Sequence, residues 1–536
     1  MHGMRRASRR AQLIRVGAVG VVAVGAVVLC SCSGSAASNT GSGTASGGSG
    51  TSGVGVAGGS LKVGMGDALV DMDPQTSGSL QDLQILDNIY EGLLRQDPTN
   101  GQIEGAVASK WTASPDLKTY TFTIRNGITF QNGEKVTAGD AKWSIARILD
   151  PATKATYADD LSPIASMDTP DANTLVIHLK QPYPELLVAL SNPVYAAIMP
   201  QSNAADITSK PIGTGAFAYE SSVPKTSVTL ERYSGYWDKP TGPAIDSVEF
   251  LAIPDSNSKI QALESGQVQM IDTVPLANIK TVKGFSGLSV QTYPSTWTDY
   301  FAMQTASGPF ANVKVRQAVV MAIDKSALTQ LATFGQGQPQ DTMIVPASPI
   351  QVTAPALAYN PAQAKQLLSE AGYPNGFSFS FSTCGGTAFP EMVASGQIIA
   401  SDLQKVGINA TFKTEDSGTF ANDIFTKHDF TAYVCGLASG LDPDQRTYRY
   451  FHTNGPYNAP GYSNPAVDTA LDQARATADA GARARLYTQA WKQINQDAPW
   501  DILFTFPNVA AMSNKVHGFP LDPNNYMDLN DVSLSK

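Results

Sequence analysis

Histidine and cysteine, which build many metal centres and nucleophilic active sites, are scarce in this sequence. Its 536 residues include four cysteines and five histidines, and the histidines, at positions 2, 178, 428, 452 and 517, do not stand at the spacing of metal ligands. The motifs G-x-S-x-G and H-E-x-x-H are missing as well. The sequence therefore predicts no catalytic residues, no metal and no cofactor, which disfavours a secreted hydrolase.

Positive charge is also too scarce for a nucleic-acid-binding protein. The chain has 37 lysines and arginines against 46 aspartates and glutamates, a formal net charge of −9, whereas phosphate binding needs a clustered basic surface. Hydrophobic residues nevertheless make up 42% of the chain, which excludes disorder over most of its length. The composition indicates an acidic globular protein of several domains without nucleic acid as a partner.

The first 31 residues have the pattern of a signal peptide. Five arginines precede an uncharged apolar run, Val16–Leu29, which is shorter than the ~20 residues of a membrane-spanning helix. The run ends in Leu29-Cys30-Ser31-Cys32, which resembles the bacterial lipobox. We predict cleavage after Ser31 and lipidation of Cys32; use of Cys30, or retention of the apolar run as an uncleaved anchor, stays open as an alternative.

Residues 32–60 follow as a tether rich in Gly, Ser, Ala and Thr. Such a segment cannot bury enough apolar surface to offset its backbone entropy, so it is predicted to be flexible. It would hold the acidic domain outside the cytoplasm, at the outer face of the cytoplasmic membrane.

From residue 61 onward, strand and helix patterns alternate without a repeat. Leu61–Met65, Thr119–Ile124 and Ile128–Phe130 have strand patterns. Helix starts are predicted at a capping box from Thr137 and at two Asn-Pro pairs, Asn360-Pro361 and Asn464-Pro465. The alternation predicts the α/β class.

Motifs spread over residues 61–536 resemble extracytoplasmic solute-binding protein family 5, the dipeptide- and oligopeptide-binding lipoproteins of bacterial ABC importers. In chain order they are Ile89–Leu94, Leu117–Phe122, Arg125–Phe130, Val136–Asp140, Gly213–Phe217, Arg232–Trp237, Ala262–Gly266, Val313–Lys325, Tyr359–Tyr373 and Gly461–Pro465. No single motif is specific, but their shared order and spacing identify the family.

The resemblance implies a two-lobed clamshell, the type II, cluster C-like fold of periplasmic binding proteins. Lobe one would comprise residues 61–298, with an extra subdomain at about 107–210, and lobe two would comprise residues 299–503. Residues 504–536 would return to lobe one. Ligand would bind between the lobes and stabilise their closed arrangement.

The segment that anchors the peptide in relatives is altered here. In peptide-binding members a Trp-Gly-Ala-Asp-Tyr-type loop supplies an Asp that pairs with the α-ammonium of the peptide. Alignment on Asp442-Pro443-Asp444 puts Ser439 in place of that Asp and Gly436 in place of the Trp. The pocket would then suit a ligand without a free α-amino group, unless the register differs and Asp442 or Asp444 forms the pair.

The resemblance and the strand pattern together yield nine candidate ligand-binding residues. They are Asp71, Met72, Trp297, Tyr300, Ser417, Gly436, Leu437, Ala438 and Ser439. Relatives also imply that the strands ending in Cys384 and Cys435 are neighbours. We predict a disulfide between these cysteines, because exported proteins with two remaining cysteines usually pair them; two buried free thiols are the alternative.

The predicted function is therefore that of a monomeric, lipid-anchored receptor. It would capture a peptide or peptide-like solute and deliver it to an ABC permease, with membrane lipid as a further partner through the acylated cysteine. A sensor that presents ligand to a membrane receptor, and a receptor for a non-peptide solute, are the alternatives.

Overall fold

The computed structural model describes residues 57–69, 71–238, 243–384, 389–438 and 440–536. The predicted signal peptide, Cys32, most of the predicted tether and Ser439 lie outside these ranges. All strands and helices of the described residues belong to one unit, residues 53–536.

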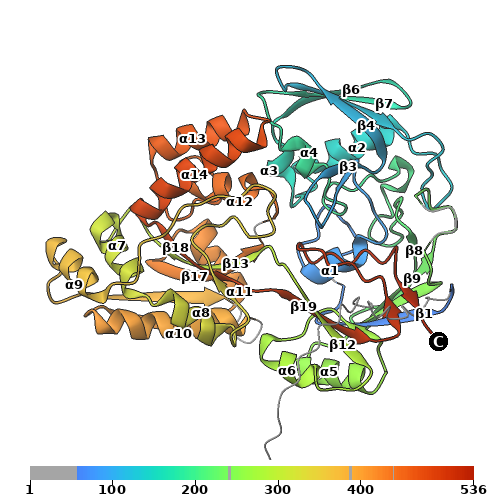
Figure 1. Ribbon diagram of the computed structural model, residues 1–536. Coiled ribbons are helices and arrows are strands. Elements are labelled where there is room, and N and C mark those ends of the chain that lie inside the picture. The colour runs from blue at the N-terminus through green and yellow to red at the C-terminus, as the bar shows by residue number, and fades with distance from the viewer. Residues whose placement is uncertain (1–56, 70, 239–242, 385–388, 439) are drawn as a thin grey trace, which may run out of the picture. The chain divides into compact units, whose positions relative to one another are not determined.

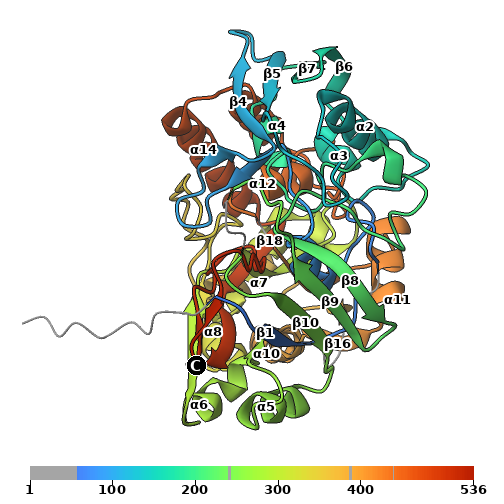
Figure 2. The same cartoon turned by 90° about the vertical axis from the view of Figure 1, so that its right-hand side faces the viewer.

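The first sheet has seven strands in the order β12-β19-β11-β1-β10-β9-β8. They are β1 (Ser60–Met65), β8 (Phe217–Val223), β9 (Ser227–Arg232), β10 (Ser247–Ala252), β11 (Met270–Ile271), β12 (Leu288–Tyr293) and β19 (Asn508–Ser513). Figure 2 shows β8, β9 and β10 side by side. The strand predicted at Leu61–Met65 is confirmed as β1, which runs parallel to β10 and β11 and buries Leu61, Val63 and Met65 in one core.

Three helices accompany this sheet: α1 (Leu80–Leu86), α5 (Ser256–Glu264) and α6 (Ile279–Val282). In Figure 1, α5 and α6 lie next to β12. Their apolar side chains form a core with β11, β12 and β19.

A second, antiparallel sheet has the order β4-β5-β7-β6. Its strands are β4 (Ala108–Ala113), β5 (Thr119–Ile124), β6 (Ile164–Asp171) and β7 (Thr174–Leu179), and its helices are α2 (Ala138–Leu149), α3 (Ala158–Leu161) and α4 (Leu186–Ala189). The strand predicted at Thr119–Ile124 is confirmed as β5, in which every second side chain is buried. The capping box is confirmed too, since Thr137 and Asp140 bond each other's backbone N–H at the start of α2.

The strand predicted at Ile128–Phe130 was wrong. Only an isolated bridge between Thr129 and Lys135 forms there. The two Asn-Gly turns lie so close together that the intervening residues close a tight loop before they can build a ladder.

The third sheet has six strands in the order β14-β18-β13-β17-β15-β16. They are β13 (Trp297–Met303), β14 (Gln338–Pro339), β15 (Ser378–Cys384), β16 (Asn409–Glu415), β17 (Ala432–Ala438) and β18 (Trp500–Thr505). Successive residues of β13 point to opposite faces, so Phe301 and Met303 join one core and Tyr300 and Ala302 join the other.

Helices cover both faces of this sheet (Figure 1). One set is α7 (Val313–Ala322), α8 (Lys325–Ala332), α9 (Pro361–Glu370) and α10 (Pro390–Lys405); the other is α11 (Ser417–Ala421), α12 (Asp444–Phe451), α13 (Pro465–Arg475) and α14 (Ala480–Asp497). The starts predicted at Asn360-Pro361 and Asn464-Pro465 are confirmed, because each Asn caps its helix and each Pro is the first helical residue.

The chain crosses twice between the seven-stranded and six-stranded sheets. It leaves β12 at Tyr293 and enters β13 at Trp297, and it leaves β18 at Thr505 and enters β19 at Asn508. Two small pairs complete the fold: β2 (Leu94–Gln96) with β3 (Ile103–Gly105), and β20 (Val516–His517) with β21 (Ser533–Leu534). The predicted α/β class is thus confirmed. No helix in the described part of the chain has the length and apolarity to span a membrane.

Candidate functional site

One edge of the six-stranded sheet gathers four of the predicted ligand-binding residues. β15, β16 and β17 run parallel, so their carboxyl ends meet at this edge. β13 is antiparallel to β17 and brings Trp297 opposite Ala438 and Asp299 opposite Gly436. Trp297, Gly436, Leu437 and Ala438 therefore lie together, at the kind of sheet edge where α/β folds bind ligands. Ser417 is exposed at the first position of α11, just after the end of β16.

The indole of Trp297 occupies the space beside Gly436. Its Nε1 donates a 2.8 Å hydrogen bond to Oδ1 of Asp299, and its ring stacks on Phe389 with 5.8 Å between centroids. A Cβ at Gly436 would lie 2.5 Å from both Trp297 Nε1 and Asp299 Oδ1. The absence of a side chain at Gly436 is therefore what lets the indole of the neighbouring strand lie here.

Asp299 and Glu391 are two acidic residues of this region that the sequence prediction missed. The Asp299 side chain is fully buried, and its Oδ2 has no hydrogen-bond partner among the described residues. Burial, reinforced by the charge of Glu391, raises the pKa of Asp299 well above its usual range. Glu391, in the first turn of α10, has a pKa raised by burial to about 7. An Asp inside the apolar strand Trp297–Met303 was the signal that could have revealed this pair.

Cys384 and Cys435 end up on neighbouring parallel strands, as the family resemblance implied. Thr383 of β15 pairs with Val434 of β17, so the two cysteines follow at the next register position. Both are free cysteines in the structure, and the predicted disulfide stays a prediction. A hydrogen bond between the thiols lowers the pKa of Cys384 and raises that of Cys435.

The other predicted residues lie elsewhere. Tyr300 is fully buried, and its ring stacks on Trp500 at 3.9 Å, so this residue packs in the core beneath the edge. Asp71 follows β1 and accepts hydrogen bonds from the Asp73 backbone N–H and from Oγ1 of Thr76. Met72 is half-buried against the core of the seven-stranded sheet. Asp71 and Met72 thus lie in the loop between β1 and α1, and neither is part of the sheet that carries Trp297.

Two ion pairs join the four-stranded sheet's helices to α12 and α14. Arg449 Nη1 lies 2.8 Å from Oδ2 of Asp160, and Arg483 Nη2 lies 2.8 Å from Oε1 of Glu185. All four residues are buried. Beside them Gln445 Nε2 donates a 3.2 Å hydrogen bond to the Tyr157 hydroxyl. The sequence carried no local signal of these contacts, because the partners lie almost 300 residues apart.

Asp442 and Asp444, the alternative partners for a ligand ammonium, are each held by an arginine. Arg483 donates to both carboxylate oxygens of Asp442, at 2.8 and 2.9 Å. Arg475 likewise binds Asp444, with Nη2 2.7 Å from Oδ2. These buried carboxylates are therefore committed to the protein itself.

A cavity of about 490 Å³ is lined mainly by residues of segments 87–98, 188–193 and 520–531, and it reaches α12 at Gln445. Its described lining has one cation, Arg95, and eight carboxylates: Asp87, Glu91, Asp97, Glu104, Asp238, Asp522, Asp528 and Asp531. Burial raises the pKa of Glu91 to about 7 and that of Asp522 to about 6. Glu91 is bonded to Thr214, Tyr236 and Trp237, which gives it a structural role.

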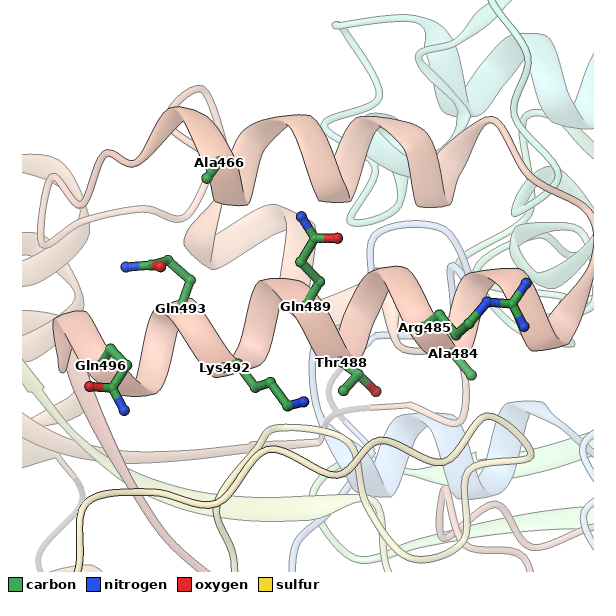
Figure 3. A pocket seen from close by; sticks show the side chains of 8 residues that line it. All are labelled: Ala466, Ala484, Arg485, Thr488, Gln489, Lys492, Gln493 and Gln496. Atoms are coloured by element: carbon green, nitrogen blue, oxygen red, sulfur yellow. The ribbon is translucent and has the colours of Figure 1, made fainter.

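A hollow of about 630 Å³ lies on α14 and reaches α13 at Ala466 (Figure 3). Most of its side chains, among them Arg485, Gln489, Lys492 and Gln493, are polar. None of the predicted ligand-binding residues lines it. No group of three or more His, Cys, Asp or Glu within the described ranges is arranged to hold a metal ion.

Comparisons with known proteins match this architecture. The chain is 29% identical to the glutathione-binding protein GsiB of Escherichia coli strain K12 over 484 residues, covering 88% of this chain and 94% of that protein. Its structure resembles PBP AgaA of A. tumefaciens R10 in complex with agropinic acid, with a TM-score of 0.77, 25% identity and coverage of 89% and 99%. It also resembles DppA of Helicobacter pylori in complex with the peptide STSA, with a TM-score of 0.78, 23% identity and coverage of 90% and 99%.

These neighbours are two-lobed periplasmic binding proteins. The predicted clamshell fold is thereby confirmed, while the assignment of residues to the two lobes stays a prediction. The family consists of solute-binding proteins and not of enzymes. Residues 102–458 match the model of the bacterial extracellular solute-binding proteins, family 5 Middle, and the chain belongs to this family.

Proposed function

We propose that this protein is the ligand-capturing receptor of an ABC importer, and that it binds a peptide or peptide-like solute between its two lobes. Lobe one would comprise residues 61–298 with the return at 504–536, and lobe two residues 299–503. The receptor would act as a monomer and pass its ligand to a permease in the cytoplasmic membrane.

The observation that carries this proposal is the gathering of Trp297 with Gly436–Ala438 at the carboxyl edge of the six-stranded sheet. Trp297 offers a rigid aromatic surface whose N–H is already bonded to Asp299, so a ligand would contact the ring and not compete for that bond. Main-chain groups at the end of β17 would bind an extended ligand as an added strand does. Asp71 and Met72 would approach from lobe one.

The ligand class follows from the charges that this edge lacks. Ser439 would replace the carboxylate that neutralises a peptide's α-ammonium in relatives, and a serine accepts a hydrogen bond without carrying charge. Asp442 and Asp444 are bound by arginines. We therefore expect N-acetylated peptides to bind about as well as peptides with a free amino group. The likeness to GsiB makes glutathione a candidate, and the AgaA complex favours a non-peptide solute as the second candidate.

Calorimetry with dipeptides to tetrapeptides, their N-acetyl forms and glutathione tests the proposal. Trp297→Ala should weaken binding by ~2 kcal/mol or more, the usual loss when an aromatic anchor is truncated in a closed pocket. Trp111→Ala is the matched control, because Trp111 is also half-buried but packs on the four-stranded sheet. Equal losses in the two variants, or the absence of binding by all of these compounds, would contradict the proposal.

Anchoring at Cys32 forms a separate part of the proposal. The charged start, the short apolar run and the small residue at 31 support cleavage before Cys32. Stable anchorage needs more than one acyl chain, as bacterial lipoproteins have. Cys32→Ser should release the protein into the medium. Retention of this variant in the membrane fraction would mean that Cys30 or the apolar run is the anchor.

A further inference from the structure

Helices α12, α13 and α14 carry four arginines near lobe one. Three of them are paired with a buried carboxylate, and the fourth is not. Arg449, Arg475 and Arg483 each hold a buried carboxylate at 2.7 to 2.8 Å. Arg446, on α12, makes one hydrogen bond, from Nε to the carbonyl of Ala438. Over the described ranges it has no ion pair, and the segments outside them contain no Asp or Glu.

The bond to Ala438 ties this guanidinium to the end of β17, next to the candidate ligand-binding residues. On the opposite side are two stacked tyrosines of lobe one, Tyr157 and Tyr195, with ring centroids 5.1 Å apart. Gln445, the neighbour of Arg446, is bonded to the Tyr157 hydroxyl. Burial raises the pKa of both tyrosines, and the charge of Arg446 opposes the rise in each. Arg446 therefore lies between the lobes.

No carboxylate of the described residues forms an ion pair with this guanidinium. Asp160 also feels the charge of Arg446, but both of its oxygens are bonded to Nη1 of Arg449, at 2.8 and 3.1 Å. Arg446 is half-buried, and a partly desolvated cation without a counter-ion is costly. Its Nη1 and Nη2 could together donate to the two oxygens of a carboxylate, and this bidentate arrangement is the one in which a guanidinium binds a carboxylate best.

We propose that Arg446 is an anion-binding group of the ligand site and that it receives a carboxylate of the bound solute. The inference rests on the proposed function and narrows it. By the alignment on Asp442-Pro443-Asp444, Ser439 would replace the negatively charged residue of relatives, while the chain places a positive charge, Arg446, eight residues after the end of β17. The solute class is then a peptide-like compound that presents a carboxylate, and not an ammonium, to this end of lobe two.

Two measurements on the full-length protein and on Arg446→Gln test the assignment. By calorimetry, trialanine should bind the wild type at least about tenfold more tightly than trialanine amide, because a charge-assisted bidentate bond is lost with the carboxylate. Arg446→Gln should remove this preference. In thermal melting, succinate should stabilise the wild type and not Arg446→Gln. Arg485→Gln, which alters an exposed arginine of α14, should behave as the wild type in both assays (Figure 3).

The two assays separate this inference from the proposed function. If both trialanines bind equally well to the wild type and to Arg446→Gln, peptide binding stands and the role of Arg446 is refuted. If no peptide binds but succinate stabilises only proteins that retain Arg446, the anion site stands and the peptide function fails. A purely structural Arg446, which only pins Ala438, would lower the melting temperature in Arg446→Gln without changing either the acid-to-amide preference or the succinate effect.

Discussion

Replacing Asp160 by Asn should loosen the contact between the two lobes without unfolding either one. The carboxylate of Asp160 on α3 meets the guanidinium of Arg449 on α12 at 2.8 Å, and each side chain is only 9% exposed. Asn keeps the shape and one acceptor but removes the charge. Arg449 would then lie buried without a counter-ion, unless the lobes separate and water reaches it.

The size of the effect follows from this geometry. Two unit charges 2.8 Å apart attract by about 6 kcal/mol at an effective dielectric constant of 20, and desolvation offsets much of this. Hydrogen bonds to charged groups leave a net contribution of about 2 kcal/mol, which corresponds to about a thirtyfold change in an equilibrium constant. Separation of the lobes lets water reach the guanidinium of Arg449. We therefore expect the substitution to favour separation of the lobes and to leave the melting of their cores unchanged.

Hydrogen exchange over residues 157–162 is the appropriate assay. The four-residue helix α3 is too short to protect its amides alone, so their protection reports the contact with α12. Exchange should be about thirtyfold faster in Asp160→Asn than in the wild type. Asp159→Asn is the matched control, because Asp159 is 59% exposed and 3.7 Å from Arg449, a pair worth ~0–0.5 kcal/mol. Equal exchange in the wild type and Asp160→Asn would refute the reasoning, as would equal acceleration in both variants.

Three further predictions concern stability. Burial raises the pKa of Glu91 to about 7 from an ordinary value of 4.5, so the folded state binds a proton that the unfolded state has lost. The free energy of unfolding should therefore fall as the pH rises from 4.5 to 7, by at most about 3 kcal/mol. If the melting temperature of a Glu91→Gln variant fell as steeply over this pH range, the prediction would be contradicted. Gly436→Ala would put a Cβ 2.5 Å from Trp297 Nε1 and should cost ~1–3 kcal/mol; an unchanged melting temperature would mean that the indole lies elsewhere. If Cys384 and Cys435 form the predicted disulfide, it closes a loop of about 50 residues and adds ~3–4 kcal/mol; two reactive thiols in the unfolded, unreduced protein would exclude it.

Local patterns in the sequence predicted the elements whose cause is local. The alternation in Thr119–Ile124 gives a strand with one buried face, and an Asn before a Pro caps each of two helices. These signals need only neighbouring residues. The strand expected at Ile128–Phe130 failed for the complementary reason, because a strand needs a partner with room to pair, and two close turns left space for a single bridge.

The candidate site likewise contains residues whose position the sequence predicted and residues whose position it did not. The loop motif of the family brought Gly436–Ala438 to attention and the expected crossing between the lobes brought Trp297, and strand pairing places them together. Tyr300 shares the strand with Trp297 but points to the opposite face of the sheet, where Trp500 covers it. The ion pair of Asp160 with Arg449 could not be read from the sequence, because charged residues on helices resemble a solvated face until the fold brings distant partners together.

The segment from the end of β17 into α12 would join ligand recognition to the contact between the lobes. Gly436–Ala438 lie at its start, Arg446 returns to Ala438 through its Nε, and Arg449, one turn further along α12, holds Asp160 on α3. A short helix transmits a displacement of one turn to the next, because its backbone bonds link them. A ligand carboxylate that draws Arg446 toward the cleft would therefore act on the same rigid element that carries the lobe contact. Binding and closure would then share one free energy: a ligand that strengthens the closed arrangement should be bound more weakly by Asp160→Asn, even though Asp160 itself does not touch the ligand.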